Sequence, residues 1–478
     1  MKKRPLLSLL LLSILSANLA NISVCAKTPD IMRGVWLWGA TVREMGKDGA
    51  VSVVRDLEKH GFTDIFLMVK GASGVVGYPS KVALSVVKSE QDPLPEIIAA
   101  AHKKKIKVHA WYVINQDKVW AEKHPEEVMV HLKNGPLKDG RISPLAPGYQ
   151  NYIKEQVREI IDNYQVDGVH LDYIRYPHAV YSFDKYTFAE AEKRGIDVEQ
   201  VKNILNQTFY NPGDNSIVMK AYENGDPAII GWEKLRRDII GQFAQEIGEI
   251  VKSAKRPLAY SAALMPEGAY NPNYGDVHYG QNYRDSGAIY DFVVPMAYWK
   301  SFSQPPRWVG SVVVKEATAF LGKTSVYAGL QAFEVSGNKE MADAEAAALE
   351  NGSRGVVLFR YGTFVFASVQ VKKKFSGKTS VTFKLQNRTD SNIDNIEIDF
   401  EGTGLVPKKG LRIPKGAISE VNANKIALTG AQLLNLNQEF EFSVEVVKAP
   451  ASKVSAKMPS IKLSRQKRSF YPVYTVVK

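Results

Sequence analysis

The stretch Val166-Asp-Gly-Val-His-Leu-Asp-Tyr-Ile-Arg-Tyr-Pro177 predicts a buried strand that ends in a cluster of polar groups. Side chains of an extended chain alternate between two faces, so His170 and Asp172 share one face while the apolar Leu171 lies on the other. Pro177 ends the run because it has no N–H to offer to a sheet. Barrel enzymes carry their functional groups at the C-terminal ends of such strands. The stretch therefore favours a barrel with Asp172 at its rim.

Short apolar runs alternate with helical patterns on both sides of this strand. The apolar residues between Trp232 and Val251, for example, recur every three or four positions and predict a helix. Eight strands in regular alternation with helices predict a (β/α)8 TIM barrel, with a doubly wound open sheet as the alternative. A long insertion, about 178–230, follows the fourth strand. The eight expected strands are 33–39, 64–71, 107–115, 166–173, 257–264, 291–299, 325–331 and 355–362.

The chain changes character after the barrel, which we expect to span residues 27–370. Residues 371–450 show alternation of apolar and polar residues without helical patterns, which predicts a small all-β, sandwich-like domain. We expect it to act as a packing or spacer module, with glycan binding as the alternative, since no exposed aromatic row suited to glycan is evident. Residues 451–478 carry several Lys and Arg and no Asp or Glu, which predicts a basic tail. Such a tail is either simply solvated or bound to an anionic wall polymer or membrane surface.

The N-terminus has the pattern of a secretory signal peptide. Basic residues at 2–4 precede an apolar run at 6–15 and then small residues up to Ala26. We expect cleavage after Ala26, with Ala20 as the second choice, and a secreted or periplasmic, cell-envelope location. The formal charge of the chain, +12, falls to +9 without this segment. Nucleic acid is a poor partner for an exported protein.

The chain has one cysteine, Cys25, which lies inside this segment. The mature chain then has no disulfide, thiol nucleophile or cysteine metal site. A lipid anchor on Cys25 is an alternative, although Val24 is large for the residue before a lipidated cysteine. Motifs for phosphate, nicotinamide, serine-hydrolase or zinc-hydrolase chemistry are missing where they would matter, so we expect no cofactor.

Aromatic, amide and basic side chains gather at the ends of the expected strands. Sugar rings stack on aromatic planes and sugar hydroxyls need directed hydrogen bonds, so this combination predicts a carbohydrate site. The predicted substrate-binding residues are Trp38, Lys70, Trp111, Asn115, His170, Arg175, Tyr176, Tyr298, Trp299, Gln331, Arg360 and Tyr361.

Glycoside cleavage needs two carboxyl groups, one to protonate the leaving oxygen and one to act as nucleophile or to activate water. Asp172 is the first candidate, as nucleophile or base. For the acid we prefer Glu267, just past the fifth strand, over Glu334, Glu223 and Asp226.

Three side chains, those of Arg175, Lys70 and His170, are candidate neighbours of Asp172. Arg175 and Lys70 are expected to keep it ionised, because a nearby cation lowers the pKa of a carboxyl group. His170 is expected to donate to a sugar hydroxyl; a lone imidazole is a weak metal ligand, so a metal-dependent deacetylase or hydrolase stays a minor alternative. Asp167, on the opposite face of the strand, is expected to pair structurally near its start.

An ordered set of motifs resembles the bacterial glycosyl hydrolase-like 10 family. This resemblance covers roughly Ile31 to Phe366 and implies an exported TIM barrel that cleaves glycan, with some relatives acting on peptidoglycan glycan strands. It matches Asp172 to the acidic residue of the family's fourth-strand motif. Many relatives carry a second Asp where this chain has Tyr173, and another where it has Asn282. The motifs are Arg33-Gly-Val-Trp36, Val108-His-Ala-Trp111, Ser143-Pro-Leu-Ala-Pro147, Asp167 to Pro177, Tyr279-Gly-Gln281, Asp291-Phe-Val-Val-Pro-Met296 and Gly355-Val-Val-Leu-Phe359.

The sequence therefore predicts an exported glycoside hydrolase that acts on a bacterial cell-wall glycan or another polysaccharide, peptidoglycan glycan strands included. A non-catalytic glycan-binding or wall-associated barrel is the main alternative.

Overall fold

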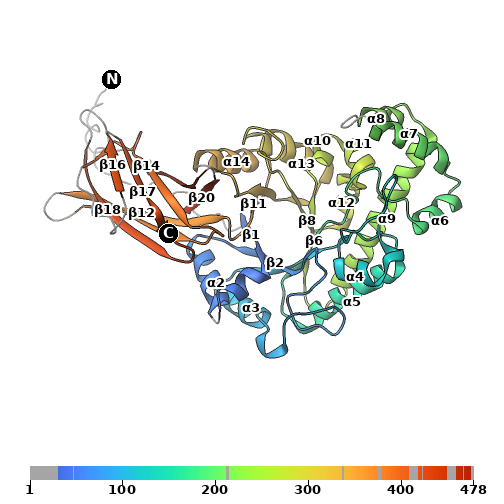
Figure 1. Ribbon diagram of the computed structural model, residues 1–478, viewed down its shortest axis with the longest axis horizontal. Coiled ribbons are helices and arrows are strands. Elements are labelled where there is room, and N and C mark those ends of the chain that lie inside the picture. The colour runs from blue at the N-terminus through green and yellow to red at the C-terminus, as the bar shows by residue number, and fades with distance from the viewer. Residues whose placement is uncertain are drawn as a thin grey trace, which may run out of the picture.

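The computed structural model describes residues 31–46, 48–210, 215–335, 338–373, 378–408, 418–422, 424–448, 459–466 and 468–474. The expected signal peptide lies outside these residues. Figure 1 shows a barrel surrounded by helices, a helical insertion at one end of the molecule and a β domain at the other. In the described part of the chain, no helix is long and apolar enough to cross a membrane.

The barrel strands form one parallel sheet in the order β10-β11-β1-β2-β3-β6-β7-β8-β9. β9 and β10 are two pieces of the seventh strand, separated by Tyr327, and a bridge between Met296 and Gly329 closes the ring. The predicted (β/α)8 barrel is confirmed, and the open-sheet alternative is wrong. The strands are β1 (Met32–Trp38), β2 (Asp64–Lys70), β3 (Lys107–Val113), β6 (Gly168–Asp172), β7 (Ala259–Leu264), β8 (Phe292–Pro295), β9 (Ser325–Val326), β10 (Ala328–Gln331) and β11 (Gly355–Phe359).

Large apolar side chains fill the inside of the barrel. Trp36, Phe66 and Trp111 pack there with Phe292 and with smaller residues such as Ala263. Gly168 has no side chain because an added Cβ would lie 2.5 Å from Nδ1 of His109. The barrel interior is therefore a packed core, and any cavity must lie above it, at the ends of the strands.

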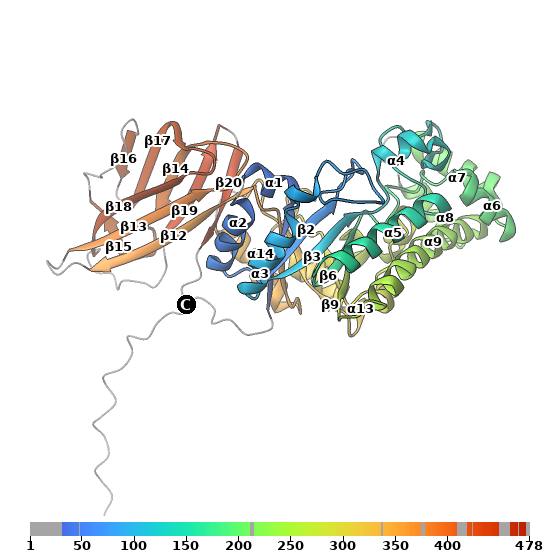
Figure 2. The ribbon, with the colours of Figure 1, turned by 90° about the horizontal axis from the view of Figure 1, so that it is seen from below.

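Amphipathic helices cover the outside of the barrel (Figure 2). The longest, α9, buries one or two apolar side chains in each turn, as the sequence predicted. The helices of the barrel are α1 (Gly39–Glu44), α2 (Gly49–Lys59), α3 (Leu94–Lys103), α4 (Lys118–Lys123), α5 (Pro147–Asn163), α9 (Pro227–Lys252), α10 (Glu267–Tyr270), α11 (Pro272–Tyr274), α12 (Tyr283–Ile289), α13 (Lys315–Leu321) and α14 (Asn338–Glu350). Short elements in the loops are β4 (Val130–His131), β5 (Gly135–Pro136), the 3-10 turns η1 (Ser89–Gln91) and η2 (Pro125–Glu127), and the π-helical turns η3 (Gly275–Tyr279) and η4 (Val309–Val314).

The insertion after β6 is helical and has its own small core. It contains α6 (Lys185–Lys193), α7 (Val198–Tyr210) and α8 (Ser216–Glu223), which pack against the first half of α9 around the buried Trp232. Asp226 caps α9 by accepting hydrogen bonds from the backbone N–H groups of Ala228 and Ile229.

The C-terminal domain is a nine-stranded sheet in the order β15-β18-β13-β12-β20-β19-β14-β17-β16, and side chains from both halves share one core. Its last two strands correct our prediction of a basic tail. Ile461, Leu463 and Phe470 are buried in the core, while Lys462 points to solvent, so this basic segment alternates like its neighbours. The strands are β12 (Phe364–Lys373), β13 (Thr379–Asn387), β14 (Ile393–Asp399), β15 (Leu405–Pro407), β16 (Ile418–Asn422), β17 (Lys425–Leu434), β18 (Glu439–Lys448), β19 (Ser460–Arg465) and β20 (Arg468–Tyr474).

A buried polar contact joins the two domains. The guanidinium of Arg388, from the loop after β13, donates through Nε to Oδ2 of Asp56 on α2 at 2.8 Å. The hydroxyl of Tyr361 donates to the same oxygen at 3.4 Å. His60, directly after α2, stacks on Phe366 of β12 with ring centroids 4.1 Å apart. The C-terminal domain is thus fixed against the β1–β11 side of the barrel.

Candidate active site

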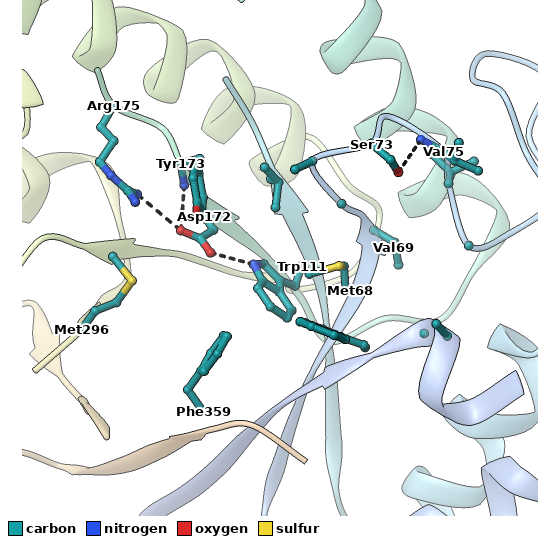
Figure 3. A pocket seen from close by; sticks show the side chains of 18 of the residues that line it. Met68, Val69, Ser73, Val75, Trp111, Asp172, Tyr173, Arg175, Met296 and Phe359 are labelled. Atoms are coloured by element: carbon teal, nitrogen blue, oxygen red, sulfur yellow. Dashed lines mark hydrogen bonds and ion pairs between the residues drawn. The ribbon is translucent and has the colours of Figure 1, made fainter. Parts of the chain in front are cut away.

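A cavity of about 760 Å³ lies at the C-terminal ends of the barrel strands. Its wall is mostly apolar, and Asp172 is its one carboxylate among the residues that the structure describes. The wall includes the ends of β1, β2, β3, β6, β8 and β11 and the loop 71–86 after β2. Figure 3 shows Asp172 facing into this space with Trp111, Met296 and Phe359 around it.

Asp172 is the last residue of β6 and is 6% exposed. Its Oδ2 accepts a hydrogen bond from the indole Nε1 of Trp111 at 3.3 Å. Its Oδ1 accepts from the backbone N–H of Tyr173 at 2.8 Å and from Nη1 of Arg175 at 3.4 Å (Figure 3). Both carboxylate oxygens therefore act as acceptors, which suits an ionised group.

The backbone conformation of Tyr173 makes one of these contacts possible. Tyr173 has φ +56°, in the left-handed region that residues other than glycine seldom adopt. This turn brings its N–H back onto the carboxylate of the preceding residue. The guanidinium of Arg175 lies 4.4 Å from the centroid of the Tyr173 ring, so the same side chain also supports the cation.

Burial raises the pKa of Asp172 above its ordinary value, although Arg175 and the hydrogen bonds from Tyr173 and Trp111 act in the opposite direction. The expectation that Arg175 and Lys70 keep the pKa of Asp172 low is therefore wrong, because the net shift of this pKa is upward. Arg175 does favour the ionised form, but desolvation outweighs it.

Lys70 does not contact Asp172, which corrects its prediction as a binding residue. Its side chain is fully buried, forms an ion pair with Asp117 at 3.3 Å and donates to the carbonyl of Val113 at 2.8 Å. The register of β2 against β3 shifts between Met68 and Lys70, a bulge that turns Lys70 away from the barrel interior.

Glu267 begins α10, directly after Met265 and Pro266, which line the cavity. Its Oε1 accepts a hydrogen bond from the hydroxyl of Tyr279 at 2.8 Å. Its Oε2 is buried and has no hydrogen-bond partner within the described residues. Burial raises the pKa of Glu267, while the Tyr279 hydroxyl and the charge of Arg175 lower it. Arg175 thus acts on both candidate carboxyl groups.

Four of the predicted binding residues line the cavity: Trp38, Trp111, Arg175 and Tyr298. Arg360 lies just outside it, with its guanidinium carbon 3.4 Å from the ring centroid of Trp38. These residues come from strands or loops at opposite sides of the barrel, and the fold brings them to one rim.

The structure places the remaining predicted binding residues inside the protein. His170 is fully buried in the barrel, where its ring nitrogens contact Trp36 Nε1 at 3.3 Å and Ser261 Oγ at 2.9 Å. Each of these remaining residues either bonds its polar atoms to other protein groups or packs its ring against them, so none of them belongs to the cavity wall. Besides His170 these residues are Asn115, Tyr176, Trp299, Gln331 and Tyr361.

The other candidate carboxylates lie apart from the cavity wall. Glu334 is exposed, Glu223 is at the end of α8, and Asp226 caps α9. Asp167 accepts from the N–H of Val108 at 2.7 Å and pairs with His102 at 2.9 Å, which confirms its structural role.

Sequence reasoning missed the apolar part of the wall. Met68 and Phe359 lie close to the ends of their strands, at positions that face into the barrel. Val86, on the loop after β2, is 66% exposed. Their position at strand ends was a usable signal, but an apolar side chain there is ordinarily part of the core. No group of three or more His, Cys, Asp or Glu that could hold a metal ion occurs among the residues described.

Residues 31–345 match the family described as glycosyl hydrolase-like 10. The chain is 22% identical over 319 residues to the glycosyl hydrolase YngK of Bacillus subtilis (strain 168), covering 57% of this chain and 55% of that protein. It is 22% identical over 322 residues to the glycosyl hydrolase DigH of Escherichia coli (strain K12), covering 56% of this chain and 65% of that protein. The alignments thus span less than two thirds of these curated relatives.

A solved structure resembles the fold of the barrel. The PgaB (BpsB) glycoside hydrolase domain from Bordetella bronchiseptica superposes with a TM-score of 0.55 at 15% identity, covering 69% of this chain and 94% of that domain. At this identity the likeness concerns the fold.

Proposed function

Because the chain belongs to the glycosyl hydrolase-like 10 family, we propose that it is an exported glycoside hydrolase, with Asp172 as nucleophile or base and Glu267 as acid. The observation that carries the proposal is the carboxyl group of Asp172 at the end of β6, held by three donors at the wall of the cavity. This is the rim at which barrel enzymes carry their chemistry.

The hydrogen bonds distinguish the roles of the two carboxyl groups. Both oxygens of Asp172 accept from fixed N–H donors, so its ionised form is supported and its orientation is set. An ionised carboxylate beside the anomeric carbon attacks it directly or takes a proton from the attacking water.

Glu267 has the features of the acid. Burial raises the pKa of both carboxyl groups, but only Glu267 has an oxygen, Oε2, that no described residue engages. In the proposed reaction a proton on Oε2, which is buried in the structure, passes to the departing glycosidic oxygen, while Oε1 stays bound to Tyr279. Arg175 stabilises the negative charge that Glu267 carries after this transfer.

The substrate we propose is a bacterial cell-wall glycan or another polysaccharide. Trp38, Trp111 and Tyr298 supply aromatic surfaces on which sugar rings stack, and the volume of about 760 Å³ falls in the range of small-molecule sites. The names of YngK and DigH describe glycosyl hydrolases. The signal-peptide pattern at the N-terminus supports export to the envelope, where wall glycan is found.

Asp172→Asn and Glu267→Gln test the two roles. We expect Asp172→Asn to lower the release of reducing ends from purified wall glycan by about 10²- to 10⁴-fold, with unchanged thermal unfolding. Glu267→Gln should lose a similar factor on glycan but little on nitrophenyl glycosides, whose leaving group departs without a proton. Asp162→Asn, an exposed position on α5, is the matched control and should behave like the wild type.

Unchanged activity of Asp172→Asn would rule out our assignment of this residue. If the wild type releases no reducing ends from any wall glycan or polysaccharide but binds one of them, the non-catalytic glycan-binding alternative is correct.

A further inference from the structure

A second pocket, of about 270 Å³, lies beside the cavity at the junction between the barrel and the C-terminal domain. Its wall combines α1, the loop after β11 and two loops of the C-terminal domain, which contribute Glu44, Arg360, Thr389 and Asn437 respectively. Figure 2 shows α1 on the side of the barrel that faces this domain. Three of these residues lie beyond residue 345, where the family match ends.

Trp38 connects the two spaces. Trp38 and Ala40 line both the cavity and the second pocket, and Trp38 is 37% exposed. The guanidinium of Arg360 packs on the Trp38 ring on the side of the second pocket. A chain-like ligand that passes Trp38 therefore leaves the cavity and meets Arg360.

Arg360 offers donors that the protein leaves available. One of them, Nη1, donates to the carbonyl of Tyr361 at 3.0 Å, whereas a guanidinium has five N–H donors. Among the described residues, no carboxylate forms an ion pair with Arg360. Gly362, at φ +95°, makes room for it, since a Cβ there would lie 2.8 Å from Nη1 of Arg360.

The C-terminal side of the pocket is held firmly. Arg388 is bound through Nε to the buried Asp56, and its Nη1 donates to Oδ1 of Asn437 at 3.2 Å. This second contact fixes the amide of Asn437 at the pocket wall. The pocket is thus built by groups that are already oriented in the absence of a ligand.

We infer that the second pocket binds a further sugar unit of the glycan that occupies the cavity, and that the C-terminal domain forms part of the substrate site. Hydroxyl groups of this unit accept from Arg360 and Asn437, and Trp38 lies between it and the unit in the cavity. The inference rests on the proposed function and gives the C-terminal domain a role beyond the packing or spacer module that its sequence indicated.

Arg360→Gln and Asn437→Gly test this inference in the full-length mature protein. Glycine is suited to position 437 because Asn437 has φ +58°. The substrates are a length ladder of end-labelled oligosaccharides prepared from peptidoglycan glycan strands. We expect the wild-type ratio of kcat/KM for long over short oligosaccharides to fall about tenfold in Arg360→Gln, the loss of a hydrogen bond from a charged donor.

Arg354→Gln is the matched control, because Arg354 is exposed and lies at the opposite end of β11. It should keep the wild-type length dependence. An unchanged ratio in both Arg360→Gln and Asn437→Gly would overturn the inference and leave the proposed function standing.

Failure of the wild type to cleave any member of the ladder would count against the proposed function instead. The pocket is then tested by calorimetric binding of the longest ladder member to Asp172→Asn protein with and without Arg360→Gln. A tenfold weaker affinity with Arg360→Gln supports the pocket, and equal affinities contradict it.

Discussion

At the scale of single residues, the site depends on two opposing effects on the pKa of Asp172: the burial of its carboxyl group and the nearby charge of Arg175. Burial raises its pKa, and three donors partly reverse this effect. Arg175 is the one formal charge among these donors and lies against the Tyr173 ring. The arrangement holds the carboxyl group in one orientation, and the charge of Arg175 lowers its pKa.

Arg175→Gln should move the acid limb of the kcat/KM profile to higher pH. Arg175 lowers the pKa of Asp172, so its loss raises that pKa further, and a larger fraction of Asp172 is protonated at a given acidic pH. If Asp172 works in its ionised form, the variant loses activity at a pH about one unit higher than the wild type does. Arg158→Gln, an exposed position on α5, removes the same charge as a control. An acid limb that stays in place would show that Asp172 does not set it.

The same scale shows why several site residues could not be predicted. Alternation correctly placed His170 and Asp172 on one face, but that face runs down into the packed barrel, and only its last residue reaches the rim. Lys70 was misplaced because a bulge in β2 interrupts the alternation. Neither the depth of a residue in the barrel nor a bulge leaves a mark in the sequence.

At the scale of elements, the strands were predictable because each is a short apolar run with glycine or polar residues at its ends. The insertion shows the limit of this approach. Arg236 of α9 is fully buried and donates to the carbonyls of His178, Val277 and His278. The periodicity of the sequence does not indicate a buried arginine. Arg236 joins α9 to the insertion and to η3. The turn η3 ends in Tyr279, the partner of Glu267.

Arg236→Leu should therefore be severely destabilising. It removes the partner of Glu233, whose pKa burial already raises to about 8, and leaves three backbone carbonyls without their donor. We expect a loss of about 3–5 kcal/mol in the free energy of unfolding by chemical denaturation. Arg194→Leu removes an exposed arginine of the same insertion, paired with Glu190 and Asp238, and should cost under about 1 kcal/mol. Equal losses in the two variants would contradict the role given to Arg236.

At the scale of the whole molecule, the C-terminal domain and the barrel meet through charged and apolar groups that are far apart in the sequence. β20, which the sequence predicts as part of a basic tail, pairs in parallel with β12 next to the barrel. The apolar alternation of β19 and β20 was masked by their basic neighbours. Pairing between the last strand and one about a hundred residues earlier is a property of the complete fold. It could not be read from a local pattern.

A double-mutant cycle on Asp56 and Arg388 measures how firmly the two domains are joined. Both side chains are almost fully buried, and their contact, 2.8 Å, is shared with Tyr361. Arg388→Leu alone leaves the buried Asp56 carboxylate with only the exposed Arg55, 3.7 Å away, as a cation, and should lower the free energy of unfolding by about 3–5 kcal/mol. Asp56→Asn with Arg388→Leu removes that charge, so the double variant should regain more than about 1 kcal/mol relative to Arg388→Leu alone. Because the pair links the domains, Arg388→Leu should also increase hydrogen exchange in α2 of the barrel as well as in the loop after β13. Additive losses in the cycle, or faster exchange confined to the C-terminal domain, would show that the domains are held together by their apolar contacts instead.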